Sequence, residues 1–417
     1  MSFFRIDLYL TLKQFFLSFL IKEKNITKKI HQFLRALSKK KEVILTSQLR
    51  VGFILVLKYL KWKYPNKKQI IINSYNLAEM VNICKNLELE IIFTKLNENL
   101  FIDEKDLKKK INKKTLAVVT TNIFNTFNDL RKVKYICNKL KVPLIEDNAI
   151  YFGNYKKEGK KKIFSGSFGD YSLNSFNIMK NISAMYGGSV ATNDKKFIVY
   201  ANNELKAYDN FSNLIFLKQS FIFLILNILK IRVIYKLFFF NVIKYATQKD
   251  NHLILSLVYP SLRFKIQNFP NYYFTRMHVI SKKMVFLQIS NQDNFNYNHK
   301  KKRENNIFYF NTLKKKKIKG IKLLKYEDPN FQNFNDFPIL VNKKKELVDY
   351  LFSKGIEIKT IQYLDCHKIF KKKKLSKRLD NYEDRVLCLP NHKSIKREYI
   401  EYIVKHLVKF YDNGEKK

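Results

Sequence analysis

The sequence predicts an α/β protein with a mostly parallel sheet covered by helices, followed by a smaller α+β domain. Three observations support this fold class. Strand-like apolar runs alternate with helical patterns between residues 43 and 147, which is the order that builds a parallel sheet. One run ends directly in an acid, Asp147. Four of the 10 glycines in 417 residues lie between positions 166 and 188.

Four short apolar runs predict buried strands, and the patterns between them predict helices. The strands are residues 70–72, 90–93, 116–119 and 142–145, and the helices are 77–87 and 133–140. Ligands of such sheets gather at the carboxyl ends of the strands. Asp147 follows the last of these runs, so we expect a ligand site there.

The chain is long enough for two hydrophobic cores, and changes of pattern predict four parts. These are an N-terminal amphipathic helical segment (1–30), a large domain (31–212), an apolar and basic helical insertion (213–268) and a small C-terminal domain (269–417). In the last part, patterns predict helices at 281–289, 346–354 and 399–411 and strands at 337–341 and 386–389. Gly355 is expected to end one of these helices.

Residues 213–245 interrupt the alternation of strands and helices. Their longest run without a charge is 219–229, which is shorter than the roughly 20 apolar residues of a spanning helix. A single transmembrane pass is therefore not expected. Two interpretations stay open: a helical hairpin buried at a dimer interface, or a basic amphipathic segment that makes a peripheral contact with a membrane.

The formal net charge of +45 also allows two interpretations. It indicates a phosphate-rich partner, or it reflects an overall preference for Lys, Asn, Ile, Phe and Tyr, as an A- and T-rich genome would give. The lysine clusters lie between apolar segments, and no nucleic-acid-binding motif occurs. We therefore expect no nucleic-acid partner.

The four cysteines are widely spaced and form no CxxC pair. This spacing argues against a metal site and a disulfide framework and favours a reducing compartment. Charged residues interrupt the apolar N-terminus, and no small-residue cleavage site follows, so a secretory signal is not expected. We expect a cytoplasmic protein, with a location at the inner face of the membrane as the alternative.

A series of short motifs follows Asp147. They are Gly-Ser-Phe-Gly-Asp at 166–170, Ser-Phe at 175–176, Lys-Asn at 180–181 and Gly-Gly at 187–188. Their order and spacing resemble the active-site core of the DegT/DnrJ/StrS family. Members of this family are aminotransferases that use pyridoxal 5'-phosphate (PLP) and act on keto sugars linked to nucleotides. The resemblance extends over about residues 30–412 and implies PLP-dependent transferase fold type I, with a mixed, mostly parallel seven-stranded sheet.

The resemblance assigns roles to four residues. A PLP enzyme needs a lysine amine that bonds to the cofactor aldehyde and later moves a proton; the resemblance implies Lys180. It implies Asp147 as the carboxylate that keeps the pyridine nitrogen protonated and Ser175 as a ligand of the phosphate. Asn122 stands where the family has a histidine or asparagine near the cofactor.

Several positions depart from the family pattern around the cofactor. Leu49 and Arg50 replace the glycine and threonine of the phosphate loop, although arginine can bind a phosphate bidentately. Leu77 stands at the position of the aromatic residue that stacks on the ring, which leaves Tyr75 as a substitute. Ile150 stands where a glutamine or histidine contacts the cofactor hydroxyl.

Three further residues are candidates for contact with the substrate. Tyr186 replaces an acidic residue before the Gly-Gly pair, and His367 and His392 match positions in the family's small domain. Because the family's dehydratase branch carries histidine in place of Lys180, the lysine favours transamination.

The resemblance thus implies an aminotransferase that moves an amino group from an amino-acid donor, which we expect to be glutamate, to a nucleotide-linked keto sugar. Its product would serve the synthesis of cell-surface polysaccharide or glycolipid, and the enzyme would be a homodimer. Two alternatives stay open. One is an aminotransferase for a lipid-linked acceptor, brought to the site by residues 213–245. The other is an inactive relative that acts as a membrane-associated or anion-binding scaffold.

Overall fold

The computed structural model describes residues 4–5, 7–124, 127–150, 154–259, 264–324, 336–371 and 382–414. Its contacts divide the chain into two compact units. The large unit comprises Leu8–Phe223 and Ile266–Asn296, and the C-terminal unit comprises the described parts of Met1–Asp7, Leu224–Lys265 and Tyr297–Lys417. These boundaries differ from the four expected parts, because the insertion is shared between the units and residues 266–296 return to the large one.

Seven strands of the large unit form one sheet in the order β1-β10-β9-β6-β5-β2-β4. They are β1 (Glu42–Thr46), β2 (Gln69–Asn73), β4 (Glu90–Thr94), β5 (Thr115–Thr121), β6 (Leu144–Asn148), β9 (Tyr171–Ser175) and β10 (Gly188–Thr192). β4, β2, β5, β6 and β9 are parallel, whereas β10 is antiparallel to both β9 and β1. The mixed, mostly parallel sheet and its four predicted strands are confirmed.

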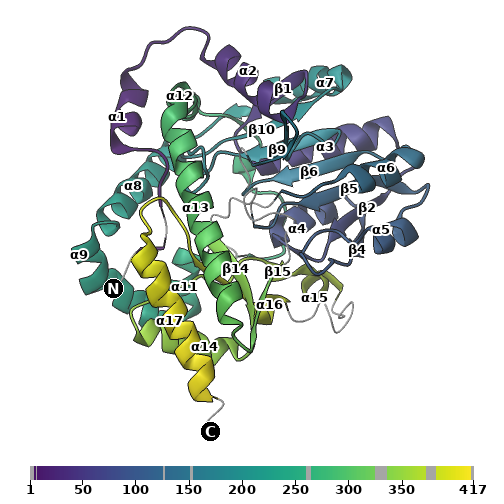
Figure 1. The fold of residues 1–417 in the computed structure, drawn as a ribbon. Coiled ribbons are helices and arrows are strands. Elements are labelled where there is room, and N and C mark those ends of the chain that lie inside the picture. The colour runs from purple at the N-terminus through teal and green to yellow at the C-terminus, as the bar shows by residue number, and fades with distance from the viewer. Residues whose placement is uncertain are drawn as a thin grey trace. The chain divides into compact units, whose positions relative to one another are not determined.

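Helices α2 (Ile26–Ser38), α3 (Leu49–Lys63), α4 (Ala78–Asn86), α5 (Glu104–Lys110), α6 (Arg131–Lys139) and α7 (Lys195–Lys206) lie beside this sheet (Figure 1). The large unit also contains α1 (Leu12–Leu20), the first part of α8 (Asn213–Leu229) and α12 (Val279–Ser290). Shorter elements are β3 (Tyr75–Asn76), the hairpin of β7 (Tyr155–Glu158) and β8 (Lys161–Phe164), the pair β11 (Asp209–Asn210) and β12 (Thr275–Arg276), and the 3-10 helix η3 (Asn271–Tyr273).

Apolar strand residues form the core of the large unit together with α5 and α6. Ile71, Val118 and Leu144 project from β2, β5 and β6 into a cluster with Leu107 and Val133 of the two helices. Every residue of β5 is buried, as expected for a central strand of a sheet covered on both faces. This continuous burial explains why the strand appears in the sequence as an unbroken apolar run.

The C-terminal unit contains a three-stranded antiparallel sheet in the order β13-β14-β16. Its elements are α9 (Arg232–Ile234), the π-helical turn η1 (Tyr235–Phe239), α10 (Phe240–Gln248), α11 (His252–Val258), α13 (Gln292–Lys316, which begins in the large unit), β13 (Ile321–Leu323), β14 (Asp336–Val341), α14 (Lys344–Ser353), β15 (Leu364–Asp365), α15 (Cys366–Lys371), α16 (Tyr382–Arg385), β16 (Val386–Pro390) and α17 (Arg397–Gly414). The strands and helices predicted after residue 269 are confirmed. Gly355 follows α14 with a φ of 75°, a left-handed conformation that suits glycine at a helix end.

The insertion forms helices rather than strands. Among the described residues, no single helix is both long and apolar enough to cross a membrane. α8 and the segment Arg232–Gln248 pass that test only together, and they meet at a bend of 85°.

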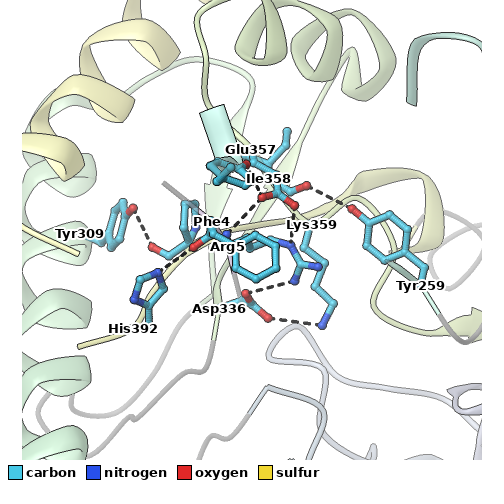
Figure 2. A network of polar contacts seen from close by, with 11 residues as sticks. Phe4, Arg5, Tyr259, Tyr309, Asp336, Glu357, Ile358, Lys359 and His392 are labelled. Carbon is cyan, nitrogen blue, oxygen red and sulfur yellow. Dashed lines mark hydrogen bonds and ion pairs between the residues drawn. The ribbon is translucent and has the colours of Figure 1, made fainter. Parts of the chain in front are cut away.

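Phe4 and Arg5, the first described residues, form a short segment that we call the strap. It is buried in the C-terminal unit (Figure 2). The backbone N–H of Arg5 donates to Glu357 Oε2 at 3.1 Å, and the Arg5 guanidinium lies 3.7 Å from carboxylate oxygens of both Glu357 and Asp336. Asp336 also pairs with Lys359 at 3.3 Å. The strap therefore places one cation between two acids inside the unit.

Glu357 depends on this cation. Its side chain is fully buried, and burial raises its pKa, while the charge of Arg5 and a hydrogen bond from Tyr235 Oη at 2.6 Å act in the opposite direction. A buried charge that loses its partner is strongly destabilising, whereas replacing both partners costs much less.

We expect Arg5→Ala to lower the free energy of unfolding by about 3–5 kcal/mol, because Glu357 stays buried without its cation. The double variant Arg5→Ala/Glu357→Gln should recover part of that loss. Lys345→Ala serves as the control, since its pair with Asp250 is exposed and should contribute about 0–1 kcal/mol. Urea unfolding measures all three. Equal effects of Arg5→Ala and Lys345→Ala would contradict this account of the strap.

Candidate active site

The carboxyl edge of the parallel strands gathers several of the predicted site residues. Asp147 lies near the end of β6, opposite Leu173 of β9 and Thr121 of β5. Ser175 ends β9 and pairs with Gly188, which in turn pairs with Thr46 at the end of β1. Four adjacent strands thus bring residues from positions 46, 147, 175 and 188 to one edge.

Asp147 is a buried carboxyl group that is held in place. Its side chain is only 2% exposed, and the backbone N–H of Ala149 donates to its Oδ1 at 2.9 Å. Burial raises the pKa of Asp147 to about 6, although this hydrogen bond and the charges of Lys180 and Arg50 lower it. The two cations are therefore near enough to favour the ionised carboxylate.

Lys180 lies, half-buried, in the loop between β9 and β10. Two backbone hydrogen bonds close the base of this loop. Phe176 N–H donates to Gly187 O at 2.9 Å, and Ala184 N–H donates to Phe176 O at 2.6 Å. Ser183 Oγ donates to the carbonyl of Lys180 at 2.7 Å. These bonds fix the backbone from which the lysine side chain projects.

Gln288 of α12 holds the same loop from outside. Its Oε1 accepts from Ser183 N–H at 2.9 Å, and its Nε2 donates to Ser183 O at 2.5 Å. Gln288 is thus a positioning residue for the Lys180 loop, 105 residues away in sequence.

Glu146, next to Asp147, explains the Gly-Ser-Phe-Gly-Asp motif. Successive side chains of a strand point to opposite faces, and Glu146 accepts hydrogen bonds from the backbone N–H groups of Gly166, at 2.7 Å, and Gly169. Asp170 closes the motif by accepting from Leu144 N–H at 2.8 Å. The motif therefore anchors the loop before β9, while Asp147 is free to serve the site.

The start of α3 forms an anion-binding geometry beside this edge. Gly188 allows a close approach, because a Cβ there would lie 2.3 Å from the Leu49 nitrogen. The first N–H groups of a helix lack intrahelical partners, and the side chain of Gln48 does not cap them. Ser47 Oγ and Gln48 Nε2 are buried and have no hydrogen-bond partner in the described part of the chain. These donors fit a phosphate group.

Arg50, in the first turn of α3, is held by two side chains of the large unit. Its Nη1 donates to Tyr273 Oη at 3.3 Å, and its Nη2 lies 3.9 Å from Glu79 Oε1. Burial disfavours the charged guanidinium, but Tyr273 and Glu79 outweigh it and raise the pKa of Arg50. Arg50 therefore stays charged, and its positive charge lowers the pKa of Asp147.

Asn122 lies beside Asp147. Its backbone N–H donates to Asp147 O at 3.0 Å, and its Nδ2 donates to Asn148 Oδ1 at 2.5 Å. The remaining predicted contacts of the cofactor keep their status as predictions: Tyr75 is buried in β3, Leu77 is half-buried directly before α4, and Leu49, Ser175 and Ile150 are buried or half-buried at the positions given above.

The candidate substrate residues differ in accessibility. Tyr186 is half-buried, with its ring 4.9 Å from that of Phe211. His392 is buried in the C-terminal unit, where Nε2 lies 3.1 Å from Phe4 O and Nδ1 accepts from Ser394 N–H at 3.3 Å. Both of its ring nitrogens are engaged within this unit, and its contact with the substrate stays a prediction. His367 begins α15 of the same unit and stays a prediction.

The arrangement combines three chemical capacities: an amine on a fixed loop, a buried carboxylate that favours a cationic partner, and a set of donors for an anion. The described residues contain no group of three or more His, Cys, Asp or Glu side chains suited to a metal ion. The resemblance placed the phosphate loop at this point of the chain, at Leu49 and Arg50, without assigning roles to Ser47 and Gln48. No pattern in the sequence indicated Ser183 and Gln288.

Comparison with solved structures identifies the class of fold. The chain superposes on the aminotransferase PseC of Helicobacter pylori with a TM-score of 0.72 and 16% identity, covering 99% of this chain and 100% of that one. An Escherichia coli GDP-4-keto-6-deoxy-D-mannose-3-dehydratase with bound hydrated PLP gives a TM-score of 0.68 at 16% identity, with coverage of 97% and 100%. The fold is that of the PLP-dependent sugar aminotransferases.

Sequence comparison then defines the family. The model of the DegT/DnrJ/EryC1/StrS aminotransferase family matches residues 17–207 of this chain. GDP-perosamine synthase of Vibrio cholerae is 32% identical over 126 residues, which are 30% of this chain and 33% of that protein. A UDP-4-amino-4,6-dideoxy-N-acetyl-beta-L-altrosamine transaminase of Helicobacter pylori is 26% identical over 131 residues, 31% and 34% of the two chains. The matches thus span about a third of these curated relatives.

The buried carboxyl group gives a pH dependence that can be measured. Because the pKa of Asp147 is raised in the folded protein, its contribution to stability is present at low pH and is lost as the pH rises through about 6. Asp147→Asn has no carboxyl group at this position and does not lose stability in this way. In cofactor-free protein, we expect the free energy of unfolding of the variant, relative to that of wild type, to increase by about 1–2 kcal/mol between about pH 5 and about pH 8.

Urea unfolding across this range measures the gain. Asp209→Asn, at an exposed carboxyl group, is the matched control and should keep a constant difference from wild type. A constant difference for Asp147→Asn as well would show that Asp147 is not the buried titrating group.

Proposed function

We propose that this protein is a PLP-dependent aminotransferase that transfers an amino group, with glutamate as donor, to a keto sugar carried on a nucleotide. The observation that carries the proposal is the buried Asp147 within the electrostatic reach of Lys180, at the carboxyl edge of a sheet of this fold. The product would feed cell-surface polysaccharide or glycolipid synthesis.

The residues present fit PLP at three points. The start of α3 with Ser47, Gln48 and Ser175 suits the phosphate, Asp147 suits the protonated ring nitrogen, and the Lys180 amine suits the aldehyde. When bound, PLP supplies an electron sink for the substrate carbon that carries the amino group. The donors left unused at Ser47 and Gln48 support this fit, since buried polar atoms normally have partners.

The remaining chemistry falls to side chains of this chain. The Lys180 amine is the group that takes and returns the proton at the reacting carbon of the substrate. Asp147 must stay ionised to hold a cationic ring nitrogen, and the field of Arg50 favours that state. Ser183 and Gln288 keep the lysine loop in place between steps.

The choice of transamination rests on Lys180. The structural relatives include both aminotransferases and dehydratases, and in the dehydratase branch a histidine replaces this lysine. Relatives named for GDP- and UDP-linked amino sugars support a nucleotide-linked acceptor. Ile150 cannot donate a side-chain hydrogen bond to the cofactor hydroxyl, so we expect weaker cofactor retention than a glutamine would give.

The state and place of the enzyme are part of this proposal. The homodimer follows from the family resemblance and the cytoplasmic location from the widely spaced cysteines; light scattering and cell fractionation test them directly.

Reduction of the PLP-loaded protein with borohydride is expected to attach the cofactor to Lys180, which peptide mass spectrometry identifies. Lys180→Ala should lose both this label and the visible absorption band of the bound cofactor. Lys58→Ala is the matched control, because Lys58 lies on α3 and pairs with Glu204 at 3.2 Å; it should keep both signals. A label on another lysine, or no bound cofactor, would refute the assignment.

Activity is best tested in two halves. Glutamate alone should discharge the visible band, and GDP-4-keto-6-deoxymannose added afterwards should restore it and yield an aminated sugar nucleotide by mass spectrometry. Lys180→Arg should lower kcat by about 10²–10⁴-fold, while Lys58→Ala should not. Discharge without any aminated product from GDP-, UDP- or TDP-linked keto sugars would exclude a nucleotide-sugar acceptor, and a deoxygenated product would show a dehydratase.

A further inference from the structure

The helix α8 is apolar on two opposite faces. Phe216, Ser220 and Phe223 are buried on its inner face. Its outer face carries large apolar side chains at helical spacing, and the most exposed are Leu214 (79%), Phe221 (64%) and Leu217 (56%). A helix that is apolar all round is normally covered all round. The outer face of α8 therefore requires a partner.

The helix α1 packs against the inner face of α8. Phe15 and Phe19 of α1 contact Phe223 and Phe216 of α8, with ring centroids 5.0 and 6.3 Å apart. α1 also leaves apolar side chains exposed, namely Leu12, Phe16, Leu17, Phe19 and Leu20. We call the exposed apolar side chains of α1 and α8 the outer patch. Large exposed apolar side chains that gather on neighbouring helices mark an interaction site.

The two segments that carry the outer patch are basic, although exposed Glu23 directly follows Lys22 and Asp7 pairs with Lys230 at 2.9 Å. Between Asn210 and Lys249 the chain has six cations and no Asp or Glu, and Lys13 and Lys22 are the only charged residues from Leu8 to Lys22. Lys13, Lys22 and Lys218 are all exposed. In the C-terminal unit the same composition continues, with exposed Ile231, Val233, Leu237 and Phe238 beside exposed Arg232 and Lys236.

We propose that the outer patch is a docking surface for an anionic membrane, with the apolar side chains in the boundary between headgroups and acyl chains and the lysines on lipid phosphates. An apolar face with basic flanks is the composition of helices that lie in the membrane interface, and juxtamembrane Lys and Arg are attracted to anionic lipids.

Charge argues against a second copy as the occupant. A two-fold interface would place the patch against itself and bring Lys13, Lys22 and Lys218 toward the same cations of the other chain. No acid of the segments 8–22 and 210–249 is available to pair with them, and like charges in contact cost several kcal/mol. An anionic lipid surface satisfies the apolar and the basic side chains together.

The test is flotation of the full-length protein with vesicles of phosphatidylcholine alone and of phosphatidylcholine mixed with phosphatidylglycerol. We expect binding to the mixed vesicles, weaker binding to phosphatidylcholine, and a loss of the difference at about 1 M salt, where the Debye length is about 3 Å. Leu217→Glu/Phe221→Glu should reduce binding to mixed vesicles at least about tenfold, because each side chain loses its transfer into the apolar phase. Lys218→Glu should reduce it mainly at low salt.

Val199→Glu is the matched control, because Val199 is an apolar residue 62% exposed on α7 of the large unit, away from α1 and α8 in sequence. It should bind as wild type, and all variants should keep the wild-type melting temperature and PLP absorption band. The proposal is overturned if wild type does not bind mixed vesicles, or if Leu217→Glu/Phe221→Glu binds like Val199→Glu. A dimer that becomes monomeric in that variant, with no vesicle binding by wild type, would identify the patch as a contact between chains instead.

Discussion

The candidate active site depends on keeping the negative charge of Asp147 inside the large unit. Asp147 is nearly inaccessible to solvent, and burial alone would neutralise it. The fold offsets this with a backbone hydrogen bond and with two cations that come from distant places, Lys180 on a loop and Arg50 at the start of a helix. A ring nitrogen that carries a proton would complete the set of partners. The carboxylate of Asp147 is thus held in position to bind a cationic ring nitrogen.

The sheet makes this arrangement possible by separating two acids that are adjacent in sequence. Glu146 and Asp147 point to opposite faces of β6, so one carboxylate organises the loop before β9 and the other serves the site. The antiparallel strand β10 begins at the same edge, where Gly188 lets α3 begin next to it. Gly188 is therefore required for a close approach of two backbones, whereas a Cβ at Gly187 would meet the side chains of Met277 and Phe176.

Much of the fold was predictable because the strands are apolar on both faces and the helices on one. The pairing of Asp147 with Lys180 was accessible through the order of the motifs. The contacts that hold these residues were not, because they join distant parts of the chain: Gln288 reaches Ser183 over 105 residues, and Arg5 reaches Glu357 over 352. A pattern confined to a short window carries no information on such pairs. The same reason applies to His392, whose contact with Phe4, 388 residues away in sequence, could not be predicted from a short window.

For the helix α8, the sequence and the structure are both needed to decide which face is buried and what covers the other face. Its sequence is apolar at nearly every position, so periodicity cannot show which face is inside. The structure assigns Phe216 and Phe223 to the interior, against α1, and leaves Leu214, Leu217 and Phe221 outside. An outer face of this kind lowers solubility in water unless it is covered, and the segments that carry it, 8–22 and 210–249, contain cations and no Asp or Glu. A partner that is both apolar and negatively charged at its surface fits these two constraints together, and a lipid bilayer with anionic headgroups is such a partner.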